Sequence, residues 1–526
     1  MLAIALLLPL SVIALLLYTV GRYFRDPKRL RRFPAPSVAA LTPLWGMWHS
    51  WTGRQYKAID AAHKRLGPVV RIAPNHVSFT DPAAYKDIYG HGMPLVKDDF
   101  YAHIAAGNPS IAQATDKAVH SGKRRSLAHI FSAREIGAME PRVMKCVMDL
   151  CEAVRVKVRG GQLGPEDAYP VAPEGDGAFD VRPWLNMFAY DAITSMLFTN
   201  SYGFLKKGND LCPSADENGV IRTVHGMDSF HSASRFNTIL AQLPGPLYTL
   251  GRKILFFDHG NQAGSAFAGM ARAQVLHRVE NQPEQPDLFS FFPITPTEKR
   301  PHPMPISEVV AECVTMMDAG NDTTQTTLTN AMYLLAANPE KQEKLYAALA
   351  AAIPADYREE PLKVLPSAIL KDVPYLRAVL EENWRCRPPV ARGLPRRTTG
   401  EGSTIGGHFI PGGVTVSAPI HVLHRDEGLF RRPLEFIPER WLPGDDELEK
   451  DEKEAQNLKN FCIAFSLGAR ACIGRNLAYM EVSIVIAALV LNFEWELAEP
   501  GSAMETVERF NCNPKELMVR AKLRYC

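Results

Sequence analysis

The 526-residue sequence predicts a mainly α-helical protein with a minor β-sheet region, behind a single N-terminal transmembrane helix. Three observations predict this class: an uncharged run over residues 2–20, a long helical pattern over 307–337, and strand-like segments that are few and short. Hydrophobic residues make up 46% of the chain and charged residues 22%, as in a globular protein with a full core. A disordered chain, a collagen-like fibre and a polytopic membrane protein are therefore excluded.

The N-terminal run predicts a retained membrane anchor. Nineteen helical residues span about 28 Å, close to the ~30 Å hydrocarbon core of a bilayer. A cleaved signal peptide is the alternative, but no base precedes the run and no small-x-small cleavage site follows it. Six basic residues and one acid lie between 22 and 32, which predicts a cytosolic side. We therefore expect an anchor over 1–21 in the endoplasmic reticulum membrane, a basic, Pro-rich hinge over 22–36, and a cytosolic body.

Cysteine use and net charge restrict the class of the body. The nine cysteines are scattered and never spaced as Cys-x-x-Cys, unlike a disulfide framework or a zinc site, which favours a reducing compartment. The formal charge is +2, but outside the basic stretch acids exceed bases by three. No nucleic-acid partner is expected from this balance.

Helical patterns dominate the body. The longest, over 307–337, has Ser307 as its predicted N-cap and ends at Asn338-Pro339. Its ~31 residues would extend about 46 Å, enough to cross a large domain, so we expect one catalytic domain over 37–526. Further helices are predicted over 138–157, 184–198, 340–352, 372–386 and 474–491, strands over 69–72, 76–79, 407–410 and 414–418, and loops over 159–178, 281–305 and 443–459.

The segment from Phe465 to Gly474, Phe-Ser-Leu-Gly-Ala-Arg-Ala-Cys-Ile-Gly, opens a helical pattern. A cysteine at a helix start receives backbone N–H groups that favour its thiolate. Gly468 and Gly474 allow a tight turn and the close approach of a flat ligand, and Arg470 can pair with an anionic group on it. The segment predicts that Cys472 is a thiolate ligand to a metal. A buried structural cysteine is the alternative, and it is what we expect of the other eight.

Polar residues interrupt the middle of the long helix, at Ala319-Gly-Asn-Asp-Thr-Thr324. A glycine inside a helix costs about 1 kcal/mol relative to alanine, so the stretch needs a reason. A threonine can hydrogen-bond back into its own helix, and the missing Cβ leaves space beside it. Asp322 and Thr323 are thus an acid and an alcohol that can relay protons. A polar helix face is the alternative, which residues 325–327 would also suit.

These segments resemble the cytochrome P450 superfamily. Phe-x-x-Gly-x-Arg-x-Cys-x-Gly is similar to its haem-binding loop, and Glu382-x-x-Arg385, Pro-Glu-Arg440-Trp and His120-x-x-x-Arg124 occur in the family's order, covering about 120–476. The family usually has tryptophan where this chain has His120. The resemblance implies the cytochrome P450 fold, with Cys472 as axial ligand of haem b and with Asp322 and Thr323 delivering protons to dioxygen.

The resemblance also implies roles for the remaining motif residues. Glu382, Arg385 and Arg440 would form a buried, structural charge network. Other residues would bind the haem: the loop residues Phe465, Arg470 and Gly474, and the propionate partners His120, Arg124 and Arg396, with Arg397 as an alternative to Arg396.

Two segments, 70–101 and 120–132, are similar to fungal benzoate para-hydroxylases. The resemblance implies a monooxygenase that inserts one oxygen atom from O2 into a C–H bond of a small, largely apolar substrate, in fungal secondary-metabolite biosynthesis. Para-hydroxylation of benzoate or a related aromatic acid is the alternative. Phe100, Tyr101 and Ile104 are expected to line the pocket, where Arg392 would either neutralise a substrate carboxylate or face solvent.

No dinucleotide-binding loop occurs in the chain, since Gly400-Glu-Gly-Ser-Thr-Ile-Gly406 has the wrong spacing. Electrons would then come from NADPH through a separate NADPH-cytochrome P450 reductase, with cytochrome b5 as a further donor. The reductase would dock on the cysteine side at bases such as Lys123 and Arg125, on a monomer. Two rival classes remain: an oxygen-independent haem-thiolate isomerase or dehydratase, which often lacks the acid–alcohol pair, and a non-catalytic haem-binding scaffold.

Overall fold

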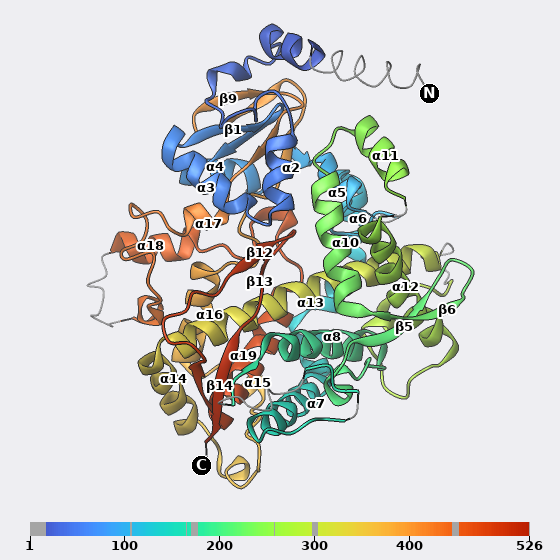
Figure 1. Cartoon of the computed structure of the whole chain (residues 1–526), viewed down its shortest axis with the longest axis vertical. Helices are drawn as coiled ribbons and strands as arrows, with labels where there is room; N and C mark the ends of the chain where they lie inside the picture. The colour runs from blue at the N-terminus through green and yellow to red at the C-terminus, as the bar shows by residue number, and fades with distance from the viewer. Residues whose placement is uncertain are drawn as a thin grey trace.

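The computed structural model describes residues 17–105, 108–164, 166–169, 177–256, 258–296, 303–443 and 452–524 (Figure 1). Residues 17–25 are helical and continue the predicted anchor, most of which lies outside the described residues. Among the described residues, one helix is long and apolar enough to cross a membrane, α19 (Arg475–Asn492), and 72% of its residues are buried inside the protein. That helix belongs to the core, and the N-terminal anchor stays a prediction.

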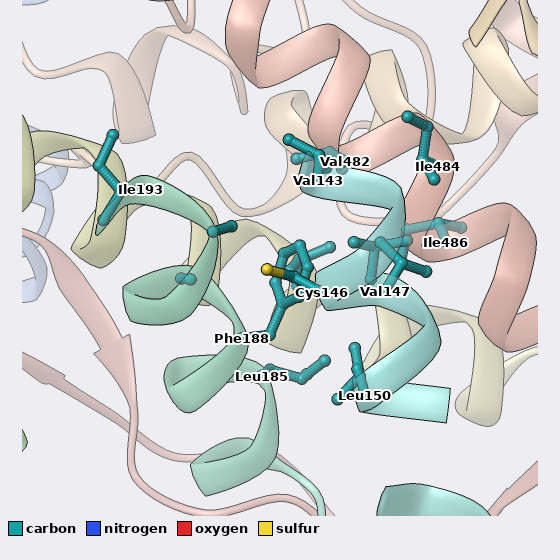
Figure 2. Close-up of a cluster of buried hydrophobic side chains, with 14 of the residues drawn as sticks. Val143, Cys146, Val147, Leu150, Leu185, Phe188, Ile193, Val482, Ile484 and Ile486 are labelled. Atoms are coloured by element: carbon teal, nitrogen blue, oxygen red, sulfur yellow. The ribbon is translucent and has the colours of Figure 1, made fainter. Parts of the chain in front are cut away.

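Four helices form the centre of the molecule: α7 (Ala133–Val158), α8 (Arg182–Phe198), α13 (Ile306–Ala337) and α19. Figure 1 shows α13 crossing the middle of the protein, with α8 beside it and α7 beyond. Their apolar side chains meet in one buried cluster, which is drawn in Figure 2. Cys146 of α7 points into this cluster toward Phe188 of α8, so it is a core cysteine, as expected of all but one.

The central helix α13 begins one residue before the predicted range and ends where the sequence predicts. Its N-cap is Pro305, in an extended conformation, and Ser307 lies inside the first turn, so the prediction of Ser307 as N-cap is wrong. Proline is favoured next to a helix start because it has no N–H group left to satisfy. The 32 residues of α13 reach about 48 Å, so residues far apart on the helix can serve different parts of one site.

The main sheet has five strands in the order β1-β2-β10-β7-β3. Strand β1 (Val69–Ala73) pairs with β2 (His76–Phe79), β10 (Thr415–Ser417) joins β2 to β7 (Arg396–Thr398), and β3 (Leu95–Lys97) forms the edge. The β3–β7 register places Lys97 opposite Arg396. The four predicted strands are confirmed, the third as β9 (His408–Pro411), which pairs with β8 (Gly402–Ile405).

A second sheet, in the order β11-β14-β4, packs near the chain's C-terminus, and the pairs β5-β6 and β12-β13 form two further two-stranded sheets. The remaining strands are β4 (Phe179–Asp180), β5 (Leu211–Ala215), β6 (Ile221–His225), β11 (Phe493–Leu497), β12 (Thr506–Glu508), β13 (Cys512–Pro514) and β14 (Met518–Leu523).

The other α-helices surround the core: α2 (Leu44–Trp51), α3 (Gln55–Leu66), α4 (Pro82–Tyr89), α5 (Asp99–His103), α6 (Lys117–Leu127), α9 (Phe204–Lys207), α10 (Gly226–Leu240), α11 (Gly245–Ile254), α12 (His259–Glu280), α14 (Pro339–Ala351), α15 (Ser367–Leu370), α16 (Pro374–Cys386), α17 (Ile420–Leu423) and α18 (Glu452–Phe461). The predicted loop over 443–459 is therefore wrong in its second half. Charge-rich composition suggested a loop, but α18 is an amphipathic helix whose Leu458 is buried.

Candidate active site around Cys472

Cys472 stands apart from the other cysteines. It is the one exposed thiol among the eight cysteines within the described residues. Burial nevertheless raises the pKa of Cys472, so the thiol faces a space that protein encloses. The N–H of Gly474 and the nearby Arg124 and Arg475 lower the pKa, as predicted for a cysteine close to a helix start, but burial outweighs them. An accessible thiol in an enclosed, cationic space suits a metal ligand.

The backbone before Cys472 is held in a fixed shape. Ser466 and Gly468 both have positive φ, at 61° and 70°, and the Cys472 N–H donates to the Phe465 carbonyl over 2.9 Å. A Cβ atom on Gly468 would lie 2.3 Å from the Tyr89 carbonyl oxygen, so only glycine fits there. The requirement for glycine thus comes from the protein's own chain. At Gly474, the N-cap of α19, a Cβ would meet only the Cys472 sulfur at 4.0 Å.

The Phe465 side chain packs the Cys472 loop against two neighbouring aromatic residues. Its ring packs edge-on against Trp384, 4.9 Å away between ring centres, and lies tilted against Tyr479 at 5.3 Å. Trp384 lies on α16 and donates its indole N–H to Thr327 of α13. The loop is therefore attached through Phe465 to the same two helices that carry the charge network and the polar stretch.

Helix α6 brings two predicted residues to the loop. Arg124 donates to the carbonyl oxygen of Ala471, next to Cys472, over 2.9 Å. His120, one turn earlier, is 6% exposed, and its imidazole has no hydrogen-bond partner in the described part of the chain. Burial, followed by the charges of Arg470 and Lys97, lowers the pKa of His120 to about 4, so the imidazole is neutral at pH 7.

Arg470 and the β3–β7 strands complete a cluster of cations. Arg470 donates to the carbonyl oxygen of Ala114 over 2.7 Å, and burial followed by Arg396 lowers its pKa to about 10. Arg396 is 5% exposed and donates to the Tyr101 hydroxyl over 3.3 Å. Lys97, opposite Arg396, has its pKa lowered well below the usual value by burial and by Arg396 and Arg470. The sequence assigned Lys97 no role.

The structure distinguishes Arg396 from Arg397. The two point to opposite sides of β7, and Arg397 is half-buried and forms an ion pair with Asp99. Arg396 faces the cation cluster instead. We define the propionate cluster as Lys97, His120, Arg124, Arg396 and Arg470.

The propionate cluster fits the haem that the resemblance implies. Within the described residues, no carboxylate forms an ion pair with any of its four charged members, while Cys472 lies beside them. Burying like charges without counterions is costly, and a ligand with two carboxylates would remove that cost. The sequence motifs identified three of these cations, and Lys97 was missed because no local pattern joins it to them.

The charge network on α16 is complete. Glu382 accepts from Arg385 through two bonds of 2.8 Å and from Arg440 over 3.0 Å, and all three side chains are fully buried. The Trp441 indole and the Ile437 N–H supply two more bonds of 3.0 Å. Despite burial, Arg385 and Arg440 hold the pKa of Glu382 below its usual value. These residues contact the core and the chain that leads to the Cys472 loop, and none reaches the propionate cluster.

Asp322 lies inside α13 and points toward the C-terminal part of the chain. Its carboxylate accepts from the side-chain amides of Asn511 and Asn513, over 2.7 and 2.6 Å, and from Gln325 over 3.1 Å. Burial raises the pKa of Asp322, although Arg509 opposes this. Asn511 and Asn513 were missed from the sequence, yet their spacing of two places both amides on one face of an extended chain.

Thr323 lies on another side of the helix. Its hydroxyl donates to the Ala319 carbonyl oxygen over 2.7 Å, which is the predicted bond back into the helix, and its side chain is accessible rather than buried. Gly320 does not leave the expected free space, because a Cβ there would lie 2.9 Å from the Ile193 side chain of α8. Asp322 and Thr323 are neighbours in the sequence, but in the structure their side chains have different partners.

The predicted pocket residues gather in an aromatic cluster. Phe100 and Tyr101 are buried with Ala241, and Ile104 and Phe510 pack against them. The rings of Phe100 and Phe510 are stacked 6.3 Å apart between centres. This cluster links the two halves of the site, because Tyr101 contacts Arg396 and Phe510 precedes Asn511, the partner of Asp322.

Arg392 joins the same cluster. Its guanidinium lies 4.8 Å above the Phe100 ring and 5.6 Å above the Phe510 ring, and it donates to the Gln55 side chain over 2.8 Å. At 6% exposure it does not face solvent, so that alternative is wrong. The two aromatic rings fix a positive charge beside the residues predicted to line the pocket.

The two bases predicted to receive a reductase behave differently. Lys123 forms ion pairs with Glu308 and Glu312 of α13, the latter at 2.9 Å, and its side chain is 10% exposed. Lys123 therefore links α6 to α13 and is not a free surface charge, so its predicted role in docking the reductase is wrong. Arg125 is exposed, and no described residue pairs with it.

Comparison with known proteins agrees with this geometry. The family model for cytochrome P450 matches residues 36–521. Benzoate 4-monooxygenase bphA of Aspergillus niger is 32% identical, and the match covers 98% of this chain and 97% of the relative. Cytochrome P450 monooxygenase traB of Penicillium crustosum is 30% identical, with 93% and 91% covered.

More distant matches extend the same pattern. Cytochrome P450 monooxygenase poxM of Penicillium oxalicum is 27% identical, over 94% of this chain and 90% of the relative. Among solved structures, a cytochrome P450, CYP102L1, matches with a TM-score of 0.70 at 17% identity, covering 94% of this chain and 99% of the other. The last comparison concerns the fold alone.

Proposed function

Because the chain belongs to the cytochrome P450 family and is a haem-thiolate monooxygenase, we propose that it inserts one oxygen atom from O2 into a C–H bond of a small, largely apolar substrate. The observation that carries the substrate class is the aromatic cluster of Phe100, Tyr101 and Phe510 beside Ile104, since such a wall binds apolar molecules. We place the reaction in fungal secondary-metabolite biosynthesis, and we treat residues 37–526 as one catalytic domain.

The residues around Cys472 would have different roles in the reaction. A haem bound through the Cys472 thiolate would activate dioxygen, since the thiolate donates electron density to iron. Lys97, Arg124, Arg396 and Arg470 would hold its propionates, with the His120 imidazole as a further donor. Thr323 would hold a proton at its accessible hydroxyl, while Asp322 would hold a proton separately, at the carboxylate that Asn511 and Asn513 bind.

Para-hydroxylation of benzoate or a related aromatic acid is the second candidate. Its support is the position of Arg392, buried against Phe100 and Phe510, together with the similarity to a benzoate 4-monooxygenase. An arginine fixed next to an aromatic wall can pair with a carboxylate on an aromatic ring.

Turnover assays decide between the two candidates. The holoenzyme, a fungal reductase, NADPH and O2 would be supplied with benzoate or with a panel of neutral lipophilic compounds. If benzoate is the substrate, Arg392→Gln should raise KM for benzoate about tenfold or more while leaving neutral substrates unaffected. Oxidation of neutral compounds alone would support the first candidate. Product formation without O2 would contradict both and indicate an isomerase or dehydratase.

The membrane association that we propose is supported at one end of the molecule. Trp48 and Trp51 of α2 are 64% and 58% exposed, and Ile254 at the end of α11 is 70% exposed. Figure 1 shows α2 and α11 at the same end as the N-terminal helix. Aromatic side chains favour the membrane interface, so this end would rest on the endoplasmic reticulum membrane, with the catalytic domain in the cytosol.

An NADPH-cytochrome P450 reductase, with cytochrome b5 as a second donor, would supply electrons to the monomer. Arg125 on α6 and Arg475 at the start of α19 are both exposed and flank the Cys472 loop. A negatively charged partner would be steered toward them. Arg125→Glu should therefore slow reductase-supported turnover without changing substrate binding.

A further inference from the structure

A second cavity lies away from Cys472, between α3, the ends of α13 and α16, and α17. Its volume is about 730 Å³, and no side chain assigned above to haem, substrate or the charge network lines it, although Ile437, whose N–H donates to Glu382, lies in its wall. This volume is in the range of small-molecule sites, which is ~300–1,000 Å³. Tyr56, Tyr333 and His421 contribute rings to its wall, and Leu334 and Met504 add apolar surface.

Positive charge dominates this cavity. Five cationic side chains line it, against the two carboxylates Glu340 and Glu435. Two of the five are already paired, Lys341 with Glu439 at 3.1 Å and Arg432 with Glu435 at 2.9 Å. The other three are Lys57, Arg387 and Arg425, and no carboxylate in the described ranges forms an ion pair with them.

Arg387 is the most informative of these cations. It directly follows α16, is half-buried, and its guanidinium lies 4.5 Å from the centre of the Tyr333 ring. None of the described residues accepts a hydrogen bond from this guanidinium. An arginine fixed on a ring keeps its planar set of donors available to a ligand.

Arg425 is fixed by two backbone carbonyl groups. It donates to the carbonyl oxygens of His421, over 3.3 Å, and Cys386. Burial lowers the pKa of Arg425, and the charges of Arg385 and Arg387 act in the same direction. His421 packs edge-on against Tyr56 at 4.8 Å, and burial and Arg425 lower its pKa well below the usual value, so at pH 7 it adds a polar group but no charge.

We propose that this cavity binds a phosphate monoester through Arg387, Arg425 and Lys57. Three cations from three different elements converge on one space, which suits a dianion with several oxygens better than a single carboxylate. The cavity exceeds the size of inorganic phosphate, so the ester's organic part would lie against the rings of Tyr56 and Tyr333. This proposal is independent of the substrate proposed above.

Calorimetric titration of the haem-loaded protein tests the proposal, because bound haem occupies the propionate cluster that could otherwise attract phosphate. The probes are ribose 5-phosphate, ribose and malonate at low ionic strength. We expect ribose 5-phosphate to bind with Kd below about 1 mM and more tightly than malonate. No binding of ribose 5-phosphate, or tighter binding of malonate, would overturn the phosphate assignment.

Matched arginine variants locate the site. Arg387→Gln should weaken ribose 5-phosphate binding about tenfold or more. Arg377→Gln is the control, since Arg377 also lies on α16 and stacks on a tyrosine ring but is paired with Glu381 outside the cavity. Lys57→Gln, on an exposed side chain whose replacement does not endanger folding, should also weaken binding. Unchanged affinity in both Arg387→Gln and Lys57→Gln would overturn the proposal.

Discussion

Two groups of arginines, Arg385 with Arg440 and Arg396 with Arg470, differ in how their charge is balanced. Arg385 and Arg440 share the carboxylate of Glu382, whose bonds to them are 2.8 to 3.0 Å long. Among the described residues, Arg396 and Arg470 donate only to a hydroxyl and to carbonyl oxygens. Both groups are conspicuous in the sequence, but only the structure shows this difference.

The difference separates a structural role from a binding role. A buried ion pair that is complete within the protein needs no ligand, and it fixes the chain around it. Buried cations without a carboxylate raise the free energy of the folded protein until an anion approaches. The propionate cluster therefore carries the stronger indication of a ligand, although the charge network has the more regular motif.

The largest effect is expected when the balanced group is broken. Glu382→Gln leaves two buried guanidinium groups without a counter-charge, which should lower the free energy of unfolding by ~3–5 kcal/mol. Chemical denaturation monitored by fluorescence measures this loss. Glu496→Gln is the control, because the Glu496–Lys522 pair is half-exposed and should cost under about 1 kcal/mol. Equal losses in the two variants would show that the network does not fix the core.

The unbalanced group should respond in the opposite way. Arg396→Gln removes a charge with no carboxylate partner, so the folded protein should lose little stability, while haem affinity should fall about tenfold or more. Haem retention through gel filtration, measured by absorbance, reports the change. Arg397→Gln should leave retention unchanged, since Arg397 pairs with Asp99. If both variants lose haem equally, the assignment of Arg396 is wrong.

A buried carboxyl group without a cation sharpens the comparison. From the part of the chain that the structure describes, Glu481 of α19 receives only a 3.4 Å bond from Thr324, and burial raises its pKa to about 8. An unfolded glutamate has a pKa of about 4.3. The protonated Glu481 therefore contributes its full stabilisation of the folded protein below that pH, and this contribution is lost as pH rises through 8. The wild type should therefore lose stability between pH 5 and 9 relative to Glu481→Gln.

Thermal unfolding across that pH range measures the effect, with Glu494→Gln as the control because Glu494 is exposed. A constant difference between the wild type and Glu481→Gln across the range would mean that Glu481 does not titrate there.

Much of the fold follows from periodicity and helix-stop signals. The ends of α13 and α16 and the strands β1, β2, β9 and β10 were predicted within a few residues, since apolar spacing and proline determine them. The N-cap of α13 and helix α18 were not, because Pro305 competes with Ser307 and because α18 has a mostly charged sequence.

Within the site, the sequence identified residues that belong to compact motifs. Cys472, Arg470, Glu382 and Arg385 lie at fixed short spacings, and such spacings are visible in one sequence. Lys97 lies within the segment 70–101 that is similar to benzoate para-hydroxylases, but its role depends on pairing between two strands 299 residues apart. The positions of Asn511 and Asn513 against Asp322 likewise depend on how the C-terminal chain returns to α13.

The central claim is that Cys472 binds haem as a thiolate. The carbon monoxide difference spectrum of the reduced, haem-loaded protein tests it most directly, with Cys472→Ala compared with Cys462→Ala. We predict a thiolate-type band in the wild type and in Cys462→Ala, and no such band in Cys472→Ala, since Cys472 is the one exposed thiol among the eight cysteines of the described residues. A thiolate-type band that survives in Cys472→Ala would contradict the account.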